Sequence, residues 1–200
     1  AIKESLKFKG LKLDPDTERT LYLLRVSQAL PAPGEEKKRS ELATIAARLE
    51  GMYGKGKWCG KGYKPGKNEA EDKKHCKDQM ALSDVLTRGG TYEAQLEAWE
   101  GWHTISRDMK KDYARMVELG NEGARDIGYA DLGEAWRSAY DMSPADFEKE
   151  VDRLWGQVKP LYDQLHCYVR GKLAAKYPGK VDPKGALPAH LLGNMWAQDW

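Results

Sequence analysis

The sequence lacks long hydrophobic runs, CxxC cysteine pairs and a large excess of charge of either sign. No apolar stretch approaches the roughly 20 residues of a transmembrane helix, so no membrane span is expected. Without CxxC pairs, the three cysteines do not support a zinc ribbon. A net charge of +2 provides no global field that attracts nucleic acid, and we expect no nucleic-acid partner.

The sequence motifs of several common active sites are also missing. It contains no HExxH zinc motif, no GxSxG nucleophile elbow, no GxxxxGK[ST] phosphate loop and no GxGxxG dinucleotide motif. The four histidines (His75, His103, His166 and His190) include no pair at the helix spacing that a zinc site uses. We therefore expect no catalytic residue and no metal ligand in this chain, and interpret His166 and His190 as structural.

Sustained alternation of apolar and polar residues is absent, so β-strands are not expected. Helical spacing of apolar residues predicts an all-α fold, with helices at 16–29, 35–53, 91–119, 132–140 and 144–176. Gly120 and Gly123 are expected to end the third helix. Ser143 followed by Pro144 predicts the start of the last one. Pro160 lies inside it and removes a backbone hydrogen bond, at a cost of about 3 kcal/mol unless the helix kinks.

Residues 54–77 are rich in glycine and lysine and are expected to form a flexible, solvated loop. Cys59 and Cys76 flank most of it. In an oxidising compartment they would form a disulfide, whereas in the cytosol both would remain thiols. Acidic neighbours and the lack of interleaved aromatic residues disfavour phosphate binding by this loop. Cys167 falls in a helical pattern and is expected to be a buried free thiol.

The sequence ends in the apolar, tryptophan-containing segment Leu187 to Trp200, LPAHLLGNMWAQDW. Chain termini are usually mobile and polar unless they are docked. We therefore expect this segment to continue into residues beyond the chain.

Four stretches carry a resemblance to a known family. They are AWEGW from Ala98, LGEAWRSAY from Leu132, PLYDQLHCYVR from Pro160 and LPAHLLGNMWAQ from Leu187. In this order and spacing, the chain resembles the angiotensin-converting-enzyme-like zinc dipeptidyl carboxypeptidases, and looks closest to bacterial members. The resemblance extends from about residue 10 to the end of the chain.

The resemblance implies a large helical ellipsoid with a central substrate channel, of which residues 1–200 form an N-terminal-side part of one peptidase domain. It implies a zinc ion whose ligands lie after GNMWAQ and hence outside this chain, and a chloride ion. The implied partners are a peptide with a free C-terminus and the remainder of the same domain. The chain by itself should be inactive, and family habit together with the paired cysteines suggests a periplasmic or secreted protein.

The resemblance also assigns roles to individual residues. Gln198 matches a glutamine that binds the substrate's terminal carboxylate, although a buried amide capping helix backbone remains the alternative. Asp199 stands where the animal enzymes tend to have a small hydroxyl residue, and if it faces the last substrate side chain it is expected to favour basic residues there. Tyr140 matches a chloride-site tyrosine, with an ordinary core tyrosine as the alternative. Cys59 and Cys76 match the family's first disulfide, with a longer loop here.

The chain departs from the family pattern at His103, and two other functions also fit the sequence. His103 replaces an arginine of a second chloride site, which puts chloride activation through two sites in doubt. A zinc-less homologue serving as a peptide-binding or interaction scaffold is the main alternative function. A self-standing helical bundle unrelated to peptidases is a third.

Overall fold

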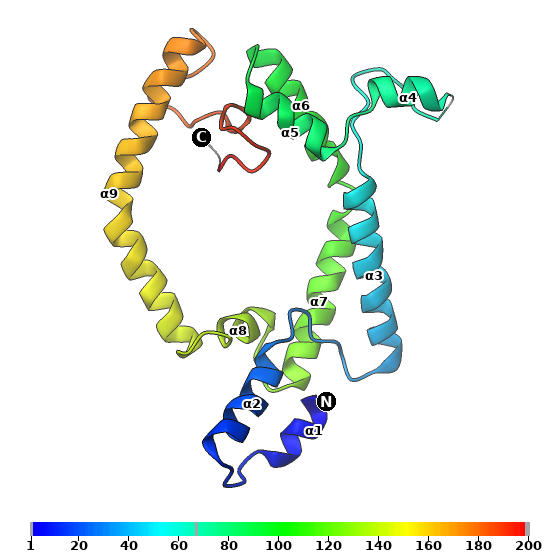
Figure 1. The fold of residues 1–200 in the computed structure, drawn as a ribbon, viewed down its shortest axis with the longest axis vertical. Coiled ribbons are helices and arrows are strands. Elements are labelled where there is room, and N and C mark those ends of the chain that lie inside the picture. The colour runs from blue at the N-terminus through cyan, green and yellow to red at the C-terminus, as the bar shows by residue number, and fades with distance from the viewer. Residues whose placement is uncertain (1, 67, 199–200) are drawn as a thin grey trace. The chain divides into compact units, whose positions relative to one another are not determined.

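The structure is a computed structural model that describes residues 2–66 and 68–198. It divides into two compact units. Unit 1 contains residues 1–49 and 111–156, and unit 2 contains residues 50–110 and 157–200. The described residues form an all-α fold without a β-strand, as the sequence predicts (Figure 1). None of the helices described is long and apolar enough to cross a membrane.

Unit 1 is built from helices of both halves of the sequence. Its elements are α1 (Ile2–Ser5), η1 (Leu6–Phe8), α2 (Pro15–Val26), most of α3 (Glu36–Lys55), nearly all of α7 (Lys110–Asp126), α8 (Leu132–Arg137) and the start of α9 (Pro144–Lys176). Most of its buried apolar side chains come from α3, α7 and α8, and these are Leu42, Ile45, Leu49, Leu119, Ala124, Leu132 and Ala135; Pro33, before α3, is also fully buried.

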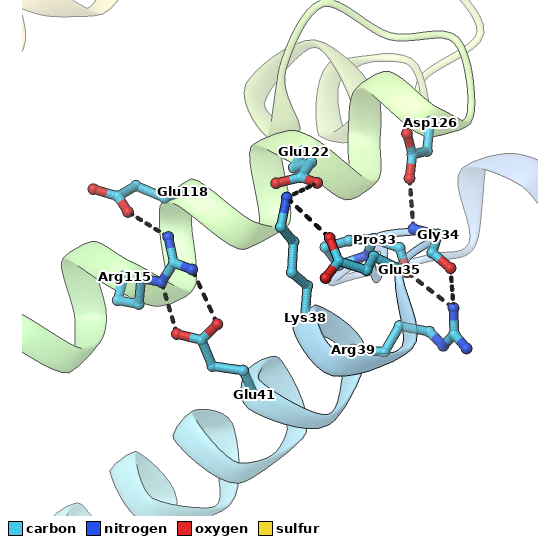
Figure 2. Close-up of polar contacts among 10 residues, drawn as sticks. All are labelled: Pro33, Gly34, Glu35, Lys38, Arg39, Glu41, Arg115, Glu118, Glu122 and Asp126. Carbon is cyan, nitrogen blue, oxygen red and sulfur yellow. Dashed lines mark hydrogen bonds and ion pairs between the residues drawn. The ribbon is translucent and has the colours of Figure 1, made fainter.

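Polar contacts between α3 and α7 accompany this core (Figure 2). The guanidinium of Arg115 donates to Glu41 at 2.8 and 3.0 Å and to Glu118 at 2.9 Å. The hydrogen bonds from Arg115 lower the pKa of the Glu41 carboxyl group. Lys38 donates to Glu122 at 2.6 Å. Because these groups are largely solvated, the pairs orient the helices more than they stabilise them.

Unit 2 contains the end of α3, α4 (Glu69–His75), α5 (Gln79–Arg88), α6 (Tyr92–Ile105), the rest of α9 and η2 (Ala189–Leu191). Its main core lies between α5, α6 and the C-terminal segment, and consists of Leu82, Leu86, Ala98, Trp102 and Met195. Trp58 packs against this core directly over Gly101, where a Cβ atom would lie 2.4 Å from the indole ring.

The predicted helix at 91–119 is wrong in its boundaries. The structure has two helices there, separated by turns at residues 106–109, and α7 continues through Gly120 and Gly123 to Asp126. A Cβ atom at Gly123 would lie 2.1 Å from the carbonyl oxygen of Pro31. This glycine therefore permits close packing inside a helix and does not end one.

The expected loop at 54–77 is partly helical. Asn68 caps α4, with its side-chain oxygen accepting from the backbone nitrogen of Ala70 at 2.9 Å. Acidic residues in the first turn and basic residues in the last complement the helix dipole. Cys59 and Cys76 are joined by a disulfide.

Helix α9 runs without interruption through Pro160 and begins as predicted, with the Ser143 hydroxyl accepting from the backbone nitrogen of Asp146 at 3.1 Å. None of its 33 residues is buried. Its exposed apolar side chains include Val151, Leu154, Trp155, Val158, Leu161, Tyr162, Leu165 and Tyr168. The expectation of a buried Cys167 is also wrong, because this helix face is open and the thiol is exposed.

Candidate functional site

The candidate site lies in the C-terminal segment of unit 2, residues 187–198. After η2 the chain makes tight turns, with Gly193 at φ 80° and Ala197 at φ 55°. The Met195 side chain is 2% exposed and belongs to the core with α5 and α6. The Thr87 hydroxyl donates to the carbonyl oxygen of Gly193 at 3.0 Å. One buried side chain and one hydrogen bond therefore attach the segment to α5.

Gln198 is positioned by the side chain of Asn194. The Asn194 amide oxygen accepts from the backbone nitrogen of Trp196 at 2.9 Å and from that of Gln198 at 3.4 Å. The side chain of Gln198 is exposed and makes no hydrogen bond to another described residue. Among the described residues, the Gln198 amide caps no helix. Its amide is free to donate to an external acceptor.

His190 lies on the buried side of the same segment. It is 4% exposed, and its ring meets Tyr92 edge-to-face at a centroid distance of 4.5 Å. Among the described residues, Nε2 has no hydrogen-bond partner. Burial lowers the pKa of His190, partly offset by the negative charge of Glu100. The ring therefore packs in the interior of unit 2 and leaves one nitrogen without a hydrogen bond among the described residues.

Tyr140 lies in unit 1, just after α8. Its ring stacks on Phe147 at a centroid distance of 4.2 Å and is 53% exposed. One face of the ring is thus packed on Phe147, and the residue remains half exposed among the described residues. Tyr140 belongs to unit 1 and Gln198 to unit 2.

His103, which replaces a chloride-site arginine of the family pattern, is already engaged locally. Its ring stacks on Trp99 at a centroid distance of 3.9 Å, and its Nδ1–H donates to the carbonyl oxygen of Trp99 at 2.7 Å. Asp199 lies outside the described residues.

Zinc requires a cluster of histidine, cysteine or carboxylate ligands. The described residues contain no group of three or more such side chains placed to hold a metal ion. They do not fit a zinc site, and no catalytic step through a metal is derived from them.

The sequence motifs match one family over nearly the whole chain. The model of the peptidase M2 family, described as angiotensin-converting enzyme, matches residues 2–200. The chain belongs to this family.

Curated members of the peptidase M2 family show the same similarity. The chain is 36% identical over 190 residues to the angiotensin-converting enzyme of Oryctolagus cuniculus, a match that covers 94% of this chain and 14% of that protein. It is 48% identical over 121 residues to the enzyme of Theromyzon tessulatum, which covers 60% of this chain and 19% of that protein. The matched segments thus cover less than a fifth of the length of these relatives.

Sequence reasoning missed the two residues that hold the site in place. Thr87 bonds to Gly193 and Asn194 bonds to the turn that carries Gln198. The Gly193-Asn194 pair was a signal for a turn, since glycine and asparagine favour such positions. Nothing in the sequence pairs Thr87 with a segment more than 100 residues away.

Proposed function

We propose that this chain is part of a zinc-dependent peptidyl-dipeptidase that releases dipeptides from free peptide C-termini. The observation that carries the proposal is the peptidase M2 match over residues 2–200. In this proposal the chain belongs to a single peptidase domain of bacterial type, and residues outside the chain hold the zinc ion. The chain alone is then inactive.

The open face of α9 supports an incomplete domain. Eight large apolar side chains of this helix are exposed, although soluble monomers rarely expose contiguous apolar patches of large area. In the proposal, the remainder of the peptidase domain covers this face. The disulfide between Cys59 and Cys76 favours an oxidising compartment, consistent with a periplasmic or secreted protein.

Gln198 is the proposed substrate-binding residue. Its exposed amide can donate a hydrogen bond to the terminal carboxylate without adding a charge to the site. A hydrogen bond to a charged group contributes about 1.5–3 kcal/mol. Loss of this hydrogen bond predicts that replacing Gln198 lowers kcat/KM for peptides with a free C-terminus by roughly 10- to 150-fold.

The test compares Gln198→Leu with the wild type in the complete enzyme. We expect kcat/KM to fall for a peptide with a free C-terminus and to change little for its C-terminal amide. Gln28→Leu, at an exposed glutamine in unit 1, is the matched control. Equal rates for Q198L and Q28L on the free acid would refute the role of Gln198.

Asp199 and Tyr140 carry two further parts of the proposal. If Asp199 faces the last substrate side chain, peptides ending in arginine should be preferred over those ending in glutamate. An unchanged preference in Asp199→Ala would exclude that role. Tyr140 is proposed to line a chloride site, and its replacement by phenylalanine should weaken any dependence of the activity on chloride.

The alternative is a zinc-less homologue that binds peptides without cleaving them. No observation of the described residues favours it. The sequence that follows Trp200 in the gene distinguishes the two, since the peptidase requires an HExxH motif and the scaffold does not.

A further inference from the structure

We propose that residues 55–66 and 68–77, here called the lysine-rich excursion, bind an anionic lipid surface through phosphate headgroups. The excursion contains seven lysines, three acidic residues and no arginine. The proposal is independent of the peptidase function, because none of these residues belongs to the candidate site.

The base of the excursion is held closed at two points. The disulfide joins Cys59 to Cys76. Beside it, the backbone nitrogen of Trp58 donates to the carbonyl oxygen of Lys77 at 2.9 Å, and that of Lys77 donates to Trp58 at 2.8 Å. These two links restrict the segment that contains the lysines. Less conformational entropy is therefore lost when the segment binds a partner.

In the sequence, acidic neighbours disfavour phosphate binding by this loop, but in the structure these acidic side chains are paired inside the excursion. Asp72 accepts from the Tyr63 hydroxyl at 2.7 Å and from the backbone nitrogen of Gly66 at 2.8 Å. The first of these bonds raises the pKa of Tyr63 to about 12. The other two carboxylates form ion pairs inside α4, Glu69 with Lys73 at 2.9 Å and Glu71 with Lys74 at 2.7 Å.

The remaining described lysines have no carboxylate partner. Their side chains are exposed, and they are Lys55, Lys57, Lys61, Lys64 and Lys77. Since the acidic groups are already paired, the excursion presents a net positive surface. Clusters of four to eight basic residues are typical of sites that bind anionic lipids.

The side chains favour a lipid surface over a nucleic acid. Lysine can bind a phosphate headgroup as a point charge. Stacking on nucleic-acid bases needs a free aromatic face, but the Tyr63 ring is stacked on His75 at 4.4 Å. Met80, three residues beyond Lys77, is 80% exposed and provides an apolar side chain that can enter a lipid interface.

The test measures sedimentation of the purified protein with phosphatidylcholine vesicles that contain phosphatidylglycerol. We expect binding that disappears in pure phosphatidylcholine and at high salt, because exposed charges are then screened. The triple variant K57Q/K61Q/K64Q should bind roughly 100-fold more weakly, from about fivefold for each lysine. Met80→Gln should weaken binding further.

A matched triple variant, K12Q/K37Q/K111Q, removes the same charge from exposed lysines of unit 1 and should retain binding. Thermal unfolding of both variants checks that they are folded. An equal loss of vesicle binding in the two triple variants would overturn the proposal. It would also fail if a sulfated polysaccharide bound while vesicles did not.

Discussion

At the scale of single residues, the glycines show which structural roles the sequence can predict and which it cannot. Gly120 and Gly123 were expected to end a helix, yet both lie inside α7. Their role becomes visible only from the neighbours, Leu30 beside Gly120 and Pro31 against Gly123. A single sequence shows that a residue is small, but the reason depends on which distant segment packs over it.

The packing of Trp58 on Gly101 can be tested by substitution. In Gly101→Ala, the new Cβ atom would lie 2.4 Å from the Trp58 ring and force the indole out of place. We expect a loss of about 1–3 kcal/mol in the free energy of unfolding, the usual cost of overpacking. Denaturant unfolding measures it.

The control is Gly51→Ala, in α3, where a Cβ atom would meet nothing within 4 Å. That change should stabilise the protein by about 0.5–1 kcal/mol through helix propensity. A G101A variant as stable as G51A would show that Trp58 does not pack on Gly101.

His190 makes stability depend on pH. Burial lowers its pKa in the folded state below the ordinary value of 6.5, so below that pH the unfolded chain takes up a proton that the folded chain does not. The stabilisation is complete above pH 6.5 and is lost as the pH falls toward the folded-state pKa.

Denaturant midpoints measured on either side of pH 6.5 check this, with His190→Phe as the comparison. We expect the variant to lose the part of the pH dependence that lies below this value. The same slope in both proteins would contradict the assignment to His190.

At the scale of elements, helix type and the start of α9 could be predicted from local signals. Ser143 and Asp146 cap that helix as expected. The sequence did not predict helix α4, because the glycine-rich residues before it made the whole segment 54–77 look like a loop. Asn68 and the acidic first turn were nevertheless signals for the start of a helix. The exposure of Cys167 depends on what lies against α9, which local sequence does not specify.

The disulfide provides a prediction for the excursion. It closes a loop with a sequence separation of 17, and removing it in C59S/C76S should cost about 3 kcal/mol by the chain-entropy model. Cys167→Ser removes an exposed thiol and should change stability by less than about 0.5 kcal/mol. Urea unfolding without reductant measures both.

Reductant should lower the stability of the wild type to that of C59S/C76S and leave the double variant unchanged. If reductant has no effect on the wild type, Cys59 and Cys76 do not stabilise unit 2 as a bonded pair.

At the scale of the whole molecule, the sequence contained enough to identify the family but not a complete site. The motif around Gln198 was recognisable, and the structure adds that Asn194 and Thr87 hold it at the surface of unit 2. No described residue buries the apolar face of α9. The sequence of this chain therefore does not identify what packs against that face.

The uncovered face predicts how the chain behaves in isolation. The chain alone should bind a hydrophobic dye and unfold over a broad temperature range, since α9 lacks buried residues. Fluorescence and calorimetry measure these properties. A single sharp, reversible transition without dye binding would indicate a self-standing helical bundle.

We propose that this chain contributes a substrate-binding wall to a zinc peptidyl-dipeptidase. The most direct measurement is mass-spectrometric analysis of the products formed by the complete enzyme from a peptide with a free C-terminus, with and without a metal chelator. We predict successive release of C-terminal dipeptides that stops when zinc is removed. An intact peptide in the presence of zinc, or cleavage that the chelator does not affect, would contradict the account.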